Sequence, residues 1–306
     1  MTSAFLAGIG TKLADRWLNA LLLPGLLWTA LLVTGLHLGQ DHPFAVDRLG
    51  DWLDQLAARP AAHAPGTVAL AASAVLLVST GVGLLAGTLG GLVEQLWALP
   101  GDLPPASWIR AWRQRRWDTA GEQLKTAIRH AARATDAART RAAQVRARQR
   151  RRSRLGPVRP GHTTRIGDRF ALATLHAAQN NGLDDLPLAW PRLWTVLSAE
   201  LRTDLAAARD TYAATARLAA WGLLYFPLAA AWWPAALIGA AVLTTAAVRA
   251  FAAADVLADL IETACDLHLN DLADRLGIPT TTPAPDTGHA ISGRLRTTAP
   301  STSDTG

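Results

Sequence analysis

Three long stretches without a charged residue set the strongest constraint on what this 306-residue chain can fold into. No Asp, Glu, Lys or Arg occurs at residues 17–40, 60–93 or 218–248. About 20 consecutive apolar residues are enough for a helix to cross the ~30 Å hydrocarbon core of a bilayer. Three such stretches in one chain, half of whose residues are hydrophobic, indicate an integral membrane protein.

The first two stretches predict a pair of membrane spans within residues 17–98. The spans are expected over residues 18–38 and 67–93, and residues 41–66 form the loop between them. The first stretch is too long for the apolar core of a cleaved signal peptide, about 7–15 residues, so we interpret it as a retained span. Before it, apolar residues recur every three or four positions, which predicts an amphipathic helix on the inner membrane surface at residues 1–16.

The third stretch is too long for one span, because a helix of its length would measure about 46 Å at ~1.5 Å per residue. Such a helix would also place Trp232 and Trp233 at the bilayer centre, whereas Trp prefers the membrane–water interface. Pro227 and Pro234 flank the two tryptophans, and proline disfavours helical geometry in the residue before it. We therefore predict two spans joined by a tight turn, four spans in all. A single tilted helix, giving three spans, is the alternative.

Glycines recur every four residues in the second span. Gly83, Gly87 and Gly91 lie on one face of the expected helix, where another helix can approach closely. This face fits packing against another span of the same chain, which we favour, or a seam between two copies. The three residues are our candidate helix-packing glycines.

The distribution of Arg and Lys predicts the orientation of the chain. Residues 101–217 contain 22 basic and 10 acidic residues, whereas the loop at 41–66 contains two basic and four acidic residues. Loops rich in Arg and Lys stay on the cytoplasmic side of the membrane. We therefore expect residues 99–216 to form a basic helical domain in the cytoplasm, together with both termini, and the 41–66 loop to lie outside.

Residues 107–154 contain no proline and predict one long cytoplasmic helix. Its first turns mix Trp with Arg, a composition that suits the anionic headgroups of a bilayer. Farther along, small apolar residues recur every seven positions, which fits a weak helical hairpin or a coiled coil. Ten arginines of this segment form the candidate basic interaction surface: Arg110, Arg113, Arg115, Arg116, Arg146, Arg148, Arg150, Arg151, Arg152 and Arg154.

The densest part of this surface, at residues 146–154, has two interpretations. We favour a solvated helix end near anionic lipid, since cations are stabilising at a helix C-terminus. A patch for nucleic acid or for an acidic partner is the other. Nucleic acid is the less favoured partner, because no aromatic residue is interleaved in the run and no nucleic-acid-binding motif accompanies it.

Residues 217–278 predict the second transmembrane hairpin, with a last helix that extends into the cytoplasm. Four acidic residues recur along one side of this extension and form the candidate acidic stripe: Asp255, Asp259, Glu262 and Asp266. Like charges at this spacing repel each other. We predict that the stripe faces basic residues of the 107–217 region, with Arg165 and Arg192 as candidates; a solvated acidic face is the alternative. Residues 279–306 are rich in Thr, Ser, Pro and Gly and are expected to be a disordered tail.

Four short segments carry a resemblance to a known family. They are Thr164-Arg-Ile-Gly-Asp-Arg169, Gly182-Leu-Asp184, Trp190-Pro-Arg-Leu-Trp194 and Ala258-Asp-Leu-Ile-Glu-Thr-Ala-Cys-Asp-Leu-His268. Over residues 160–278 the chain resembles a family of multi-pass membrane proteins from Arg- and Ala-rich actinobacterial genomes, with no known activity. The resemblance implies a bacterial plasma membrane protein and brings no catalytic residues. The chain departs from the family pattern at His162, Thr163 and Asn181, where the family has Pro before the first segment and Tyr before the second.

The sequence offers no enzymatic chemistry, cofactor site or metal site. Cys265 and His268, one helical turn apart, provide too few ligands for a metal ion. Asp184 and Asp185 are adjacent and do not share a helix face, so we interpret one of them as a helix N-cap. No hydrolase, kinase or phosphate-loop motif occurs.

These patterns favour a membrane scaffold or tether without enzymatic activity. Its Arg-rich cytoplasmic helices would contact anionic lipid and would bind a partner protein or a second copy of the chain. A small transport or pore subunit is the first alternative, although no charged residue lies inside an expected span, where ion paths usually need one. A membrane tether for nucleic acid is the second alternative.

Overall fold

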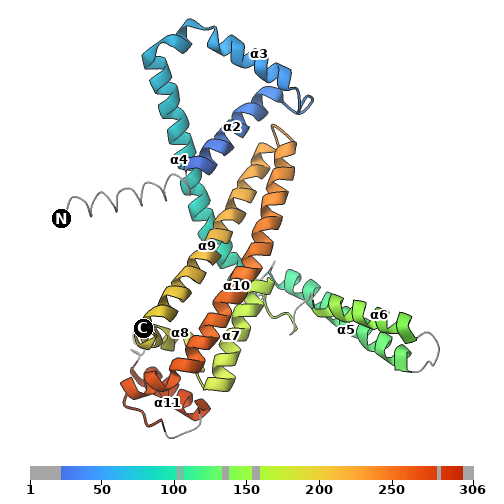
Figure 1. Cartoon of the computed structure of the whole chain (residues 1–306), viewed down its shortest axis with the longest axis vertical. Coiled ribbons are helices and arrows are strands. Elements are labelled where there is room, and N and C mark those ends of the chain that lie inside the picture. The colour runs from blue at the N-terminus through green and yellow to red at the C-terminus, as the bar shows by residue number, and fades with distance from the viewer. Residues whose placement is uncertain are drawn as a thin grey trace, which may run out of the picture. The chain divides into compact units, whose positions relative to one another are not determined.

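The structure is a computed structural model that describes residues 22–100, 102, 104, 106–132, 138–153, 159–280 and 284–298. In these residues every regular element is a helix, so the predicted all-α class is confirmed (Figure 1). The predicted surface segment at 1–16 lies outside the described residues. The chain divides into a first unit, Met1–Glu94 with Ala213–Arg249, and a second unit, Gln95–Tyr212 with Ala250–Gly306.

The first unit is built from apolar helices and the segments that join them. It contains α2 (Leu23–Leu38), α3 (Val46–Ala57), the short 3-10 helix η2 (Pro60–His63), most of α4 (Pro65–Ala98), the end of α9 (Ala199–Leu228) and the start of α10 (Pro234–Arg275). The loop expected at 41–66 therefore contains a helix of its own, α3.

The third charge-free stretch forms a helical hairpin, as predicted. Helix α9 ends at Leu228 and α10 begins at Pro234, so the Trp-Trp-Pro segment lies in the connection. The two helices approach closely at two glycines, because a Cβ atom on Gly239 would lie 2.9 Å from the carbonyl oxygen of Gly222. A single long helix over this stretch is therefore excluded.

Two helices among the described residues are long and apolar enough to cross a membrane, by length and composition. They are α4 and α10, while α2 is an apolar helix of only 16 residues. The apolar part of α9 is shorter still, because Arg217 precedes it and the turn after Leu228 ends it. The structure thus shows an all-helical chain with two such helices, fewer than the four spans predicted.

The packed side of α4 differs from the predicted glycine face. Its buried residues are Ser79, Gly83, Ala86, Gly90 and Val93. This set repeats every three and four residues in turn, the spacing of a helix seam. Of the predicted glycines, Gly83 is buried, but a Cβ atom on Gly87 or Gly91 would meet nothing within 4 Å. The favoured interpretation, packing within the chain, is wrong for Gly87 and Gly91 because a strict four-residue repeat drifts off the buried side.

The second unit holds the largest core. It contains α5 (Ala106–Ala132), α6 (Ala138–Ser153), α7 (Arg165–Asn181), α8 (Leu186–Val196), the first part of α9, the later part of α10 and α11 (Ala284–Thr298). Its fully buried side chains include Leu183, Leu193, Cys265, Leu272 and Ile291. Two sequence signals shape its helix ends: Gly182 ends α7 in the left-handed conformation, and Asp185 caps α8 by accepting a hydrogen bond from the Leu188 N–H.

The prediction of a disordered tail is wrong for residues 284–298, which form α11. Thr287, Ile291 and Leu295 recur every four residues and are almost completely buried. A Cβ atom on Gly288 would lie 1.6 Å from the Asn181 carbonyl oxygen, so this position requires glycine for α11 to reach the end of α7. Polar composition concealed the helix because its buried side is short and partly made of Thr, Ser and Gly.

The single helix predicted over 107–154 is also wrong, because the segment forms two helices, α5 and α6, that pack side by side (Figure 1). The Arg152 guanidinium lies over the Trp117 ring, 3.4 Å from its centroid, and the small Ala120 is buried. Partial burial lowers the pKa of Arg152 below its usual value, and the charge of Asp118 opposes that shift. The hairpin that the sequence allowed as a weak arrangement is thus formed.

Candidate functional site

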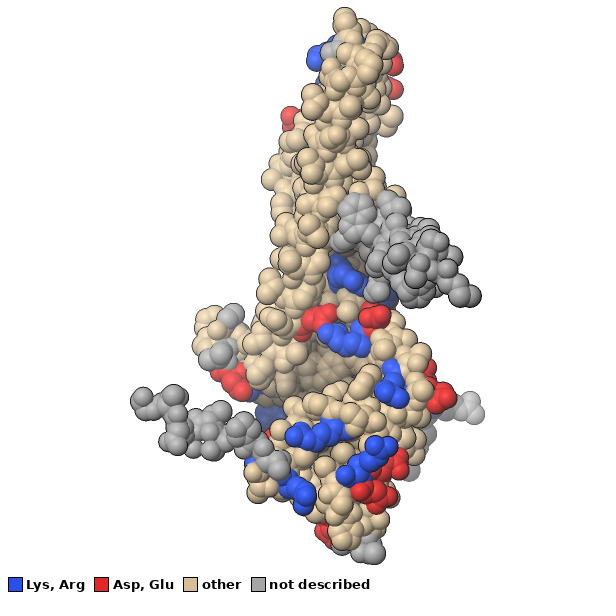
Figure 2. Space-filling view, turned by 90° about the vertical axis from the view of Figure 1, so that its left-hand side faces the viewer, with Lys and Arg blue, Asp and Glu red and all other residues tan. Residues whose placement is uncertain are grey.

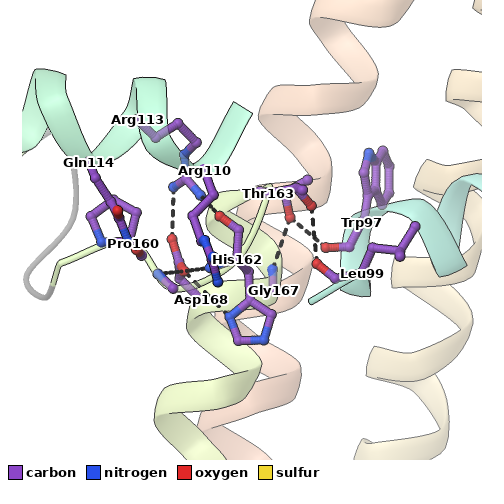
Figure 3. A network of polar contacts seen from close by, with 12 residues as sticks. Trp97, Leu99, Arg110, Arg113, Gln114, Pro160, His162, Thr163, Gly167 and Asp168 are labelled. Atoms are coloured by element: carbon purple, nitrogen blue, oxygen red, sulfur yellow. Dashed lines mark hydrogen bonds and ion pairs between the residues drawn. The ribbon is translucent and has the colours of Figure 1, made fainter. Parts of the chain in front are cut away.

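The start of α7 lies at the centre of a network of polar contacts in the second unit (Figure 3). We call Thr164–Arg169 the α7 hub. Thr164 caps the helix, because its hydroxyl oxygen accepts a hydrogen bond from the Gly167 N–H at 3.0 Å. The same hydroxyl donates to the Trp97 carbonyl at 2.5 Å, and the Thr163 hydroxyl donates to the Leu99 carbonyl at 3.2 Å. These bonds tie the end of α4 to the start of α7.

Gly167 is required in the hub because the chain approaches it from two sides. A Cβ atom there would lie 2.9 Å from the Cβ of His162 and 3.0 Å from the Trp97 carbonyl oxygen. Next to it, Ile166 is buried in the core of the second unit. The Ile-Gly pair therefore positions the helix start against both the core and the loop.

Asp168 connects the hub to α5. Its carboxylate accepts hydrogen bonds at 2.8 Å from Arg113 Nη2 and from the backbone N–H groups of Gly161 and His162. Arg113 also donates from Nη1 to the His162 carbonyl at 2.6 Å. Both charged side chains are largely shielded from solvent, with 13% of Arg113 and 22% of Asp168 exposed. The base of the α5–α6 hairpin is therefore held by a charge-assisted pair with backbone support.

Arg169 lies against the acidic stripe of α10. Its guanidinium forms ion pairs with Glu262 at 2.6 Å, with Asp255 at 3.5 Å and with Asp259. Partial burial acts to lower the pKa of Arg169, but the hydrogen bonds and charges of Glu262 and Asp259 outweigh it and raise the pKa above its usual value. The fourth acid, Asp266, accepts a hydrogen bond at 2.7 Å from Asn181.

The stripe thus faces a basic residue, as predicted, but neither candidate named from the sequence is its partner. Arg165 lies over the Phe251 ring at 4.4 Å, and Arg192 donates to the Leu188 carbonyl at 3.1 Å. Nothing in the pattern of charges alone distinguished Arg169 from Arg165, four residues earlier.

Nine of the ten arginines of the basic interaction surface lie in the described residues, and they differ in their contacts. Arg113 belongs to the hub contacts, Arg110 pairs with Asp102 at 2.6 Å, Arg116 lies over Trp112 and Arg152 over Trp117. Four others are exposed and form no ion pair with a carboxylate of the described residues: Arg115, Arg146, Arg148 and Arg151. Arg150 is exposed as well, and Arg154 lies outside the described residues.

The hairpin formed by α5 and α6 carries a large excess of positive charge. Over the two helices the sequence has thirteen Arg and Lys residues and two acids, and α6 has no acid at all. Three large apolar side chains near the start of α5 are exposed: Trp108 at 72%, Ile109 at 49% and Trp112 at 56%. Exposed aromatic residues beside Arg115 and Arg116 make this end of the hairpin amphipathic.

The described residues contain no group of three His, Cys, Asp or Glu side chains that could hold a metal ion. Comparisons of the chain with family models, with curated proteins and with solved structures found no match. The geometry of the site joins an exposed cationic hairpin to a network of polar contacts at the α7 hub.

Proposed function

We propose that this chain is a multi-pass protein of a bacterial plasma membrane that acts as a scaffold or tether without enzymatic activity. In this proposal α2, α4 and the arms of the α9–α10 hairpin span the bilayer. The second unit and both termini lie in the cytoplasm. The apolar composition of these helices supports the proposal, and one long part of the face drawn in Figure 2 carries no Lys, Arg, Asp or Glu.

The observation that carries the proposed function is the exposed charge of α6. Arg146, Arg148 and Arg151 project from a helix without acids, on a hairpin whose base is fixed by Arg113 and Asp168. Uncompensated like charge destabilises a compact protein and attracts an oppositely charged surface. A rigid helix that presents such charge at a defined place fits a docking arm for an acidic protein surface or a second copy of the chain.

The start of α5 supports contact with the bilayer itself. Trp108 and Trp112 are apolar rings with a polar N–H, the type of residue that is enriched at the membrane–water interface. Arg115 and Arg116 follow within two turns, and each basic residue near an anionic surface adds about 1 kcal/mol of attraction. We therefore assign this end of the hairpin to anionic headgroups and the α6 end to the partner.

The polar residues of the spans do not favour the pore alternative. The Thr29 hydroxyl bonds to the Gly25 carbonyl at 2.8 Å and lies 3.2 Å from the Ser79 hydroxyl, with both residues buried. Thr244 and Thr245 donate to carbonyl groups of their own helix. These hydroxyls are satisfied within and between helices, so they have no need of a water-filled path.

Photo-crosslinking in membranes tests the proposed function. A photoreactive amino acid is placed at Gln149, an exposed position of α6, in the full chain. We expect a crosslink to an acidic protein or to a second copy, and we expect Arg148→Gln with Arg151→Gln to reduce it severalfold. Arg202→Gln with Arg275→Gln, which removes two exposed charges elsewhere in the second unit, is the matched control and should leave the crosslink intact.

Two results would replace this proposal. A nuclease-sensitive crosslinked product would assign the α6 arginines to nucleic acid. Equal crosslinking in the two double variants would show that the arginines of α6 do not select the partner.

A further inference from the structure

A cleft of about 230 Å³ opens beside the start of α7. One wall is apolar and is formed by Leu172 and Leu175 of α7 and by Phe251 of α10. The lining also carries four basic side chains and two carboxylates, from Arg159, His162, Arg165, Arg169, Asp168 and Asp255. Asp168 pairs with Arg113, and Asp255 pairs with Arg169. The cleft lies entirely within the second unit. It combines an apolar surface with cations, an arrangement that suits an amphiphilic anion.

Arg165 is a cation of this cleft that makes no hydrogen bond to another described residue. Its guanidinium lies over the Phe251 ring, 4.4 Å from the ring centroid, and forms no ion pair with any described carboxylate. The neighbouring cations are compensated, since Arg169 pairs with three acids of α10 and Arg159 pairs with Asp118 at 3.0 Å. A guanidinium stacked on an aromatic ring keeps its N–H edge available for a phosphate oxygen.

Two further features of the cleft favour a negatively charged group. Arg165 is the first residue of α7, so the positive end of the helix dipole lies there. The ring of His162 has a buried Nδ1 atom with no hydrogen-bond partner among the described residues, and it lies 3.5 Å from the Asp168 carboxylate, too far for a hydrogen bond. The His162 ring lines the cleft, where its nitrogen can donate a hydrogen bond to an anion.

The cleft contains a residue close in sequence to the end of the apolar part of α10, and its hub is bonded to the end of α4. Phe251 follows Arg249, the first charged residue after the apolar stretch of α10, by two positions. On the other side, the hub bond from Thr164 reaches Trp97, one residue before the end of α4. If α4 and α10 span the bilayer, the cleft therefore opens at the level of the inner headgroups.

We propose that this cleft binds the phosphate headgroup of an acidic phospholipid from the inner leaflet. Arg165 holds the phosphate, and the first acyl carbons lie against Phe251, Leu172 and Leu175. The volume supports a headgroup and not a whole lipid, because sites that enclose a drug-sized ligand measure about 300–1,000 Å³. A zwitterionic choline headgroup is disfavoured, since its trimethylammonium group would meet the same cations. The inference rests on the membrane placement proposed above.

Binding of short-chain phosphatidylglycerol to the purified full chain in detergent tests the proposal. We expect saturable binding that weakens about tenfold in Arg165→Gln, as loss of one charge-assisted contact implies. Ala171→Phe, which places a ring in the cleft and leaves every charge in place, should weaken binding to a similar extent. Arg202→Gln removes an exposed arginine of α9 outside the cleft and should not change the affinity.

Two comparison ligands distinguish a lipid phosphate from free phosphate and an acidic headgroup from a zwitterionic one. Inorganic phosphate alone should compete weakly, because it cannot use the apolar wall, and short-chain phosphatidylcholine should bind at least severalfold more weakly than phosphatidylglycerol. Wild-type affinity in both Arg165→Gln and Ala171→Phe would overturn the proposal, as would inorganic phosphate that binds as tightly as the lipid. Thermal unfolding of each variant shows whether the fold is kept. A failed crosslink at Gln149 leaves this binding result unaffected, so the two proposals fail separately.

Discussion

Replacing Arg169 with glutamine leaves three carboxylates along one side of α10 without their cation. Arg169 is 20% exposed and Glu262 is 23% exposed, so their pair is a shielded charge-assisted contact worth about 1.5–3 kcal/mol. Asp255 and Asp259 are 61% and 69% exposed, and each of these pairs contributes only about 0–1 kcal/mol. We therefore expect Arg169→Gln to lower the free energy of unfolding by about 2–4 kcal/mol.

The assay is thermal unfolding of the full chain in detergent, followed by near-UV circular dichroism. A loss of this size corresponds to a decrease in Tm of roughly 5–10 °C for a domain of this length. Asp259→Asn removes an exposed partner and should cost less than about 1 kcal/mol, while Arg202→Gln, at an exposed site without a pair, should stay within about 0.5 kcal/mol of the wild type. An unchanged Tm in Arg169→Gln, or an equal decrease in Asp259→Asn, would refute this reasoning.

Three further predictions concern the second unit. Ile291→Ala removes a fully buried side chain and should destabilise α11 by about 2–4 kcal/mol, seen as faster amide hydrogen exchange over 284–298; unchanged protection there would mean that α11 does not dock. Asp168→Ala should loosen α5, with hydrogen exchange rising in its first turns more than in Asp168→Asn, because the amide oxygen still accepts two backbone bonds. Wild-type exchange in Asp168→Asn would argue against the charged pair with Arg113, and similar exchange in both variants would show that the two backbone bonds contribute nothing. Burial, with the charges of Asp266 and Glu262, raises the pKa of Cys265 from about 9 to about 12, so native protein should resist thiol reagents at neutral pH. The stability that this neutral thiol contributes is present below about pH 9 and is lost as the pH rises toward 12, which alkaline unfolding monitored with Cys265→Ala as control can check.

The sequence predicted those elements whose signals are local. Pro234 and the two tryptophans before it identified the turn between α9 and α10. Proline disfavours helical geometry in the residue before it, and Trp prefers the membrane–water interface to the bilayer centre. One residue of the Asp184–Asp185 pair was likewise expected to be an N-cap, and the structure shows that it is Asp185. Such features depend on a few neighbouring residues and require no knowledge of distant contacts.

The errors concern contacts between distant segments. Which arginine of α7 meets the acidic stripe depends on how α7 crosses α10, and Arg165 and Arg169 lie only one helical turn apart in sequence. Helix α11 was missed because its docking depends on Gly288 meeting Asn181 at the end of α7, a contact between residues 107 positions apart in the chain. In α4 the glycine pattern suggested a four-residue repeat, while the buried side follows Gly83 and Gly90, which are seven residues apart.

Cysteine labelling in whole cells tests the membrane placement most directly. The chain has a single cysteine, Cys265, which is fully buried, so new cysteines can be introduced against a nearly silent background. Gln55→Cys lies near the end of α3 and Ala147→Cys lies on α6, and both positions are exposed. We predict that a membrane-impermeant maleimide labels Gln55→Cys in intact cells and labels Ala147→Cys only after the membrane is opened. Labelling of Ala147→Cys in intact cells, or recovery of the chain in the soluble fraction without detergent, would contradict the account.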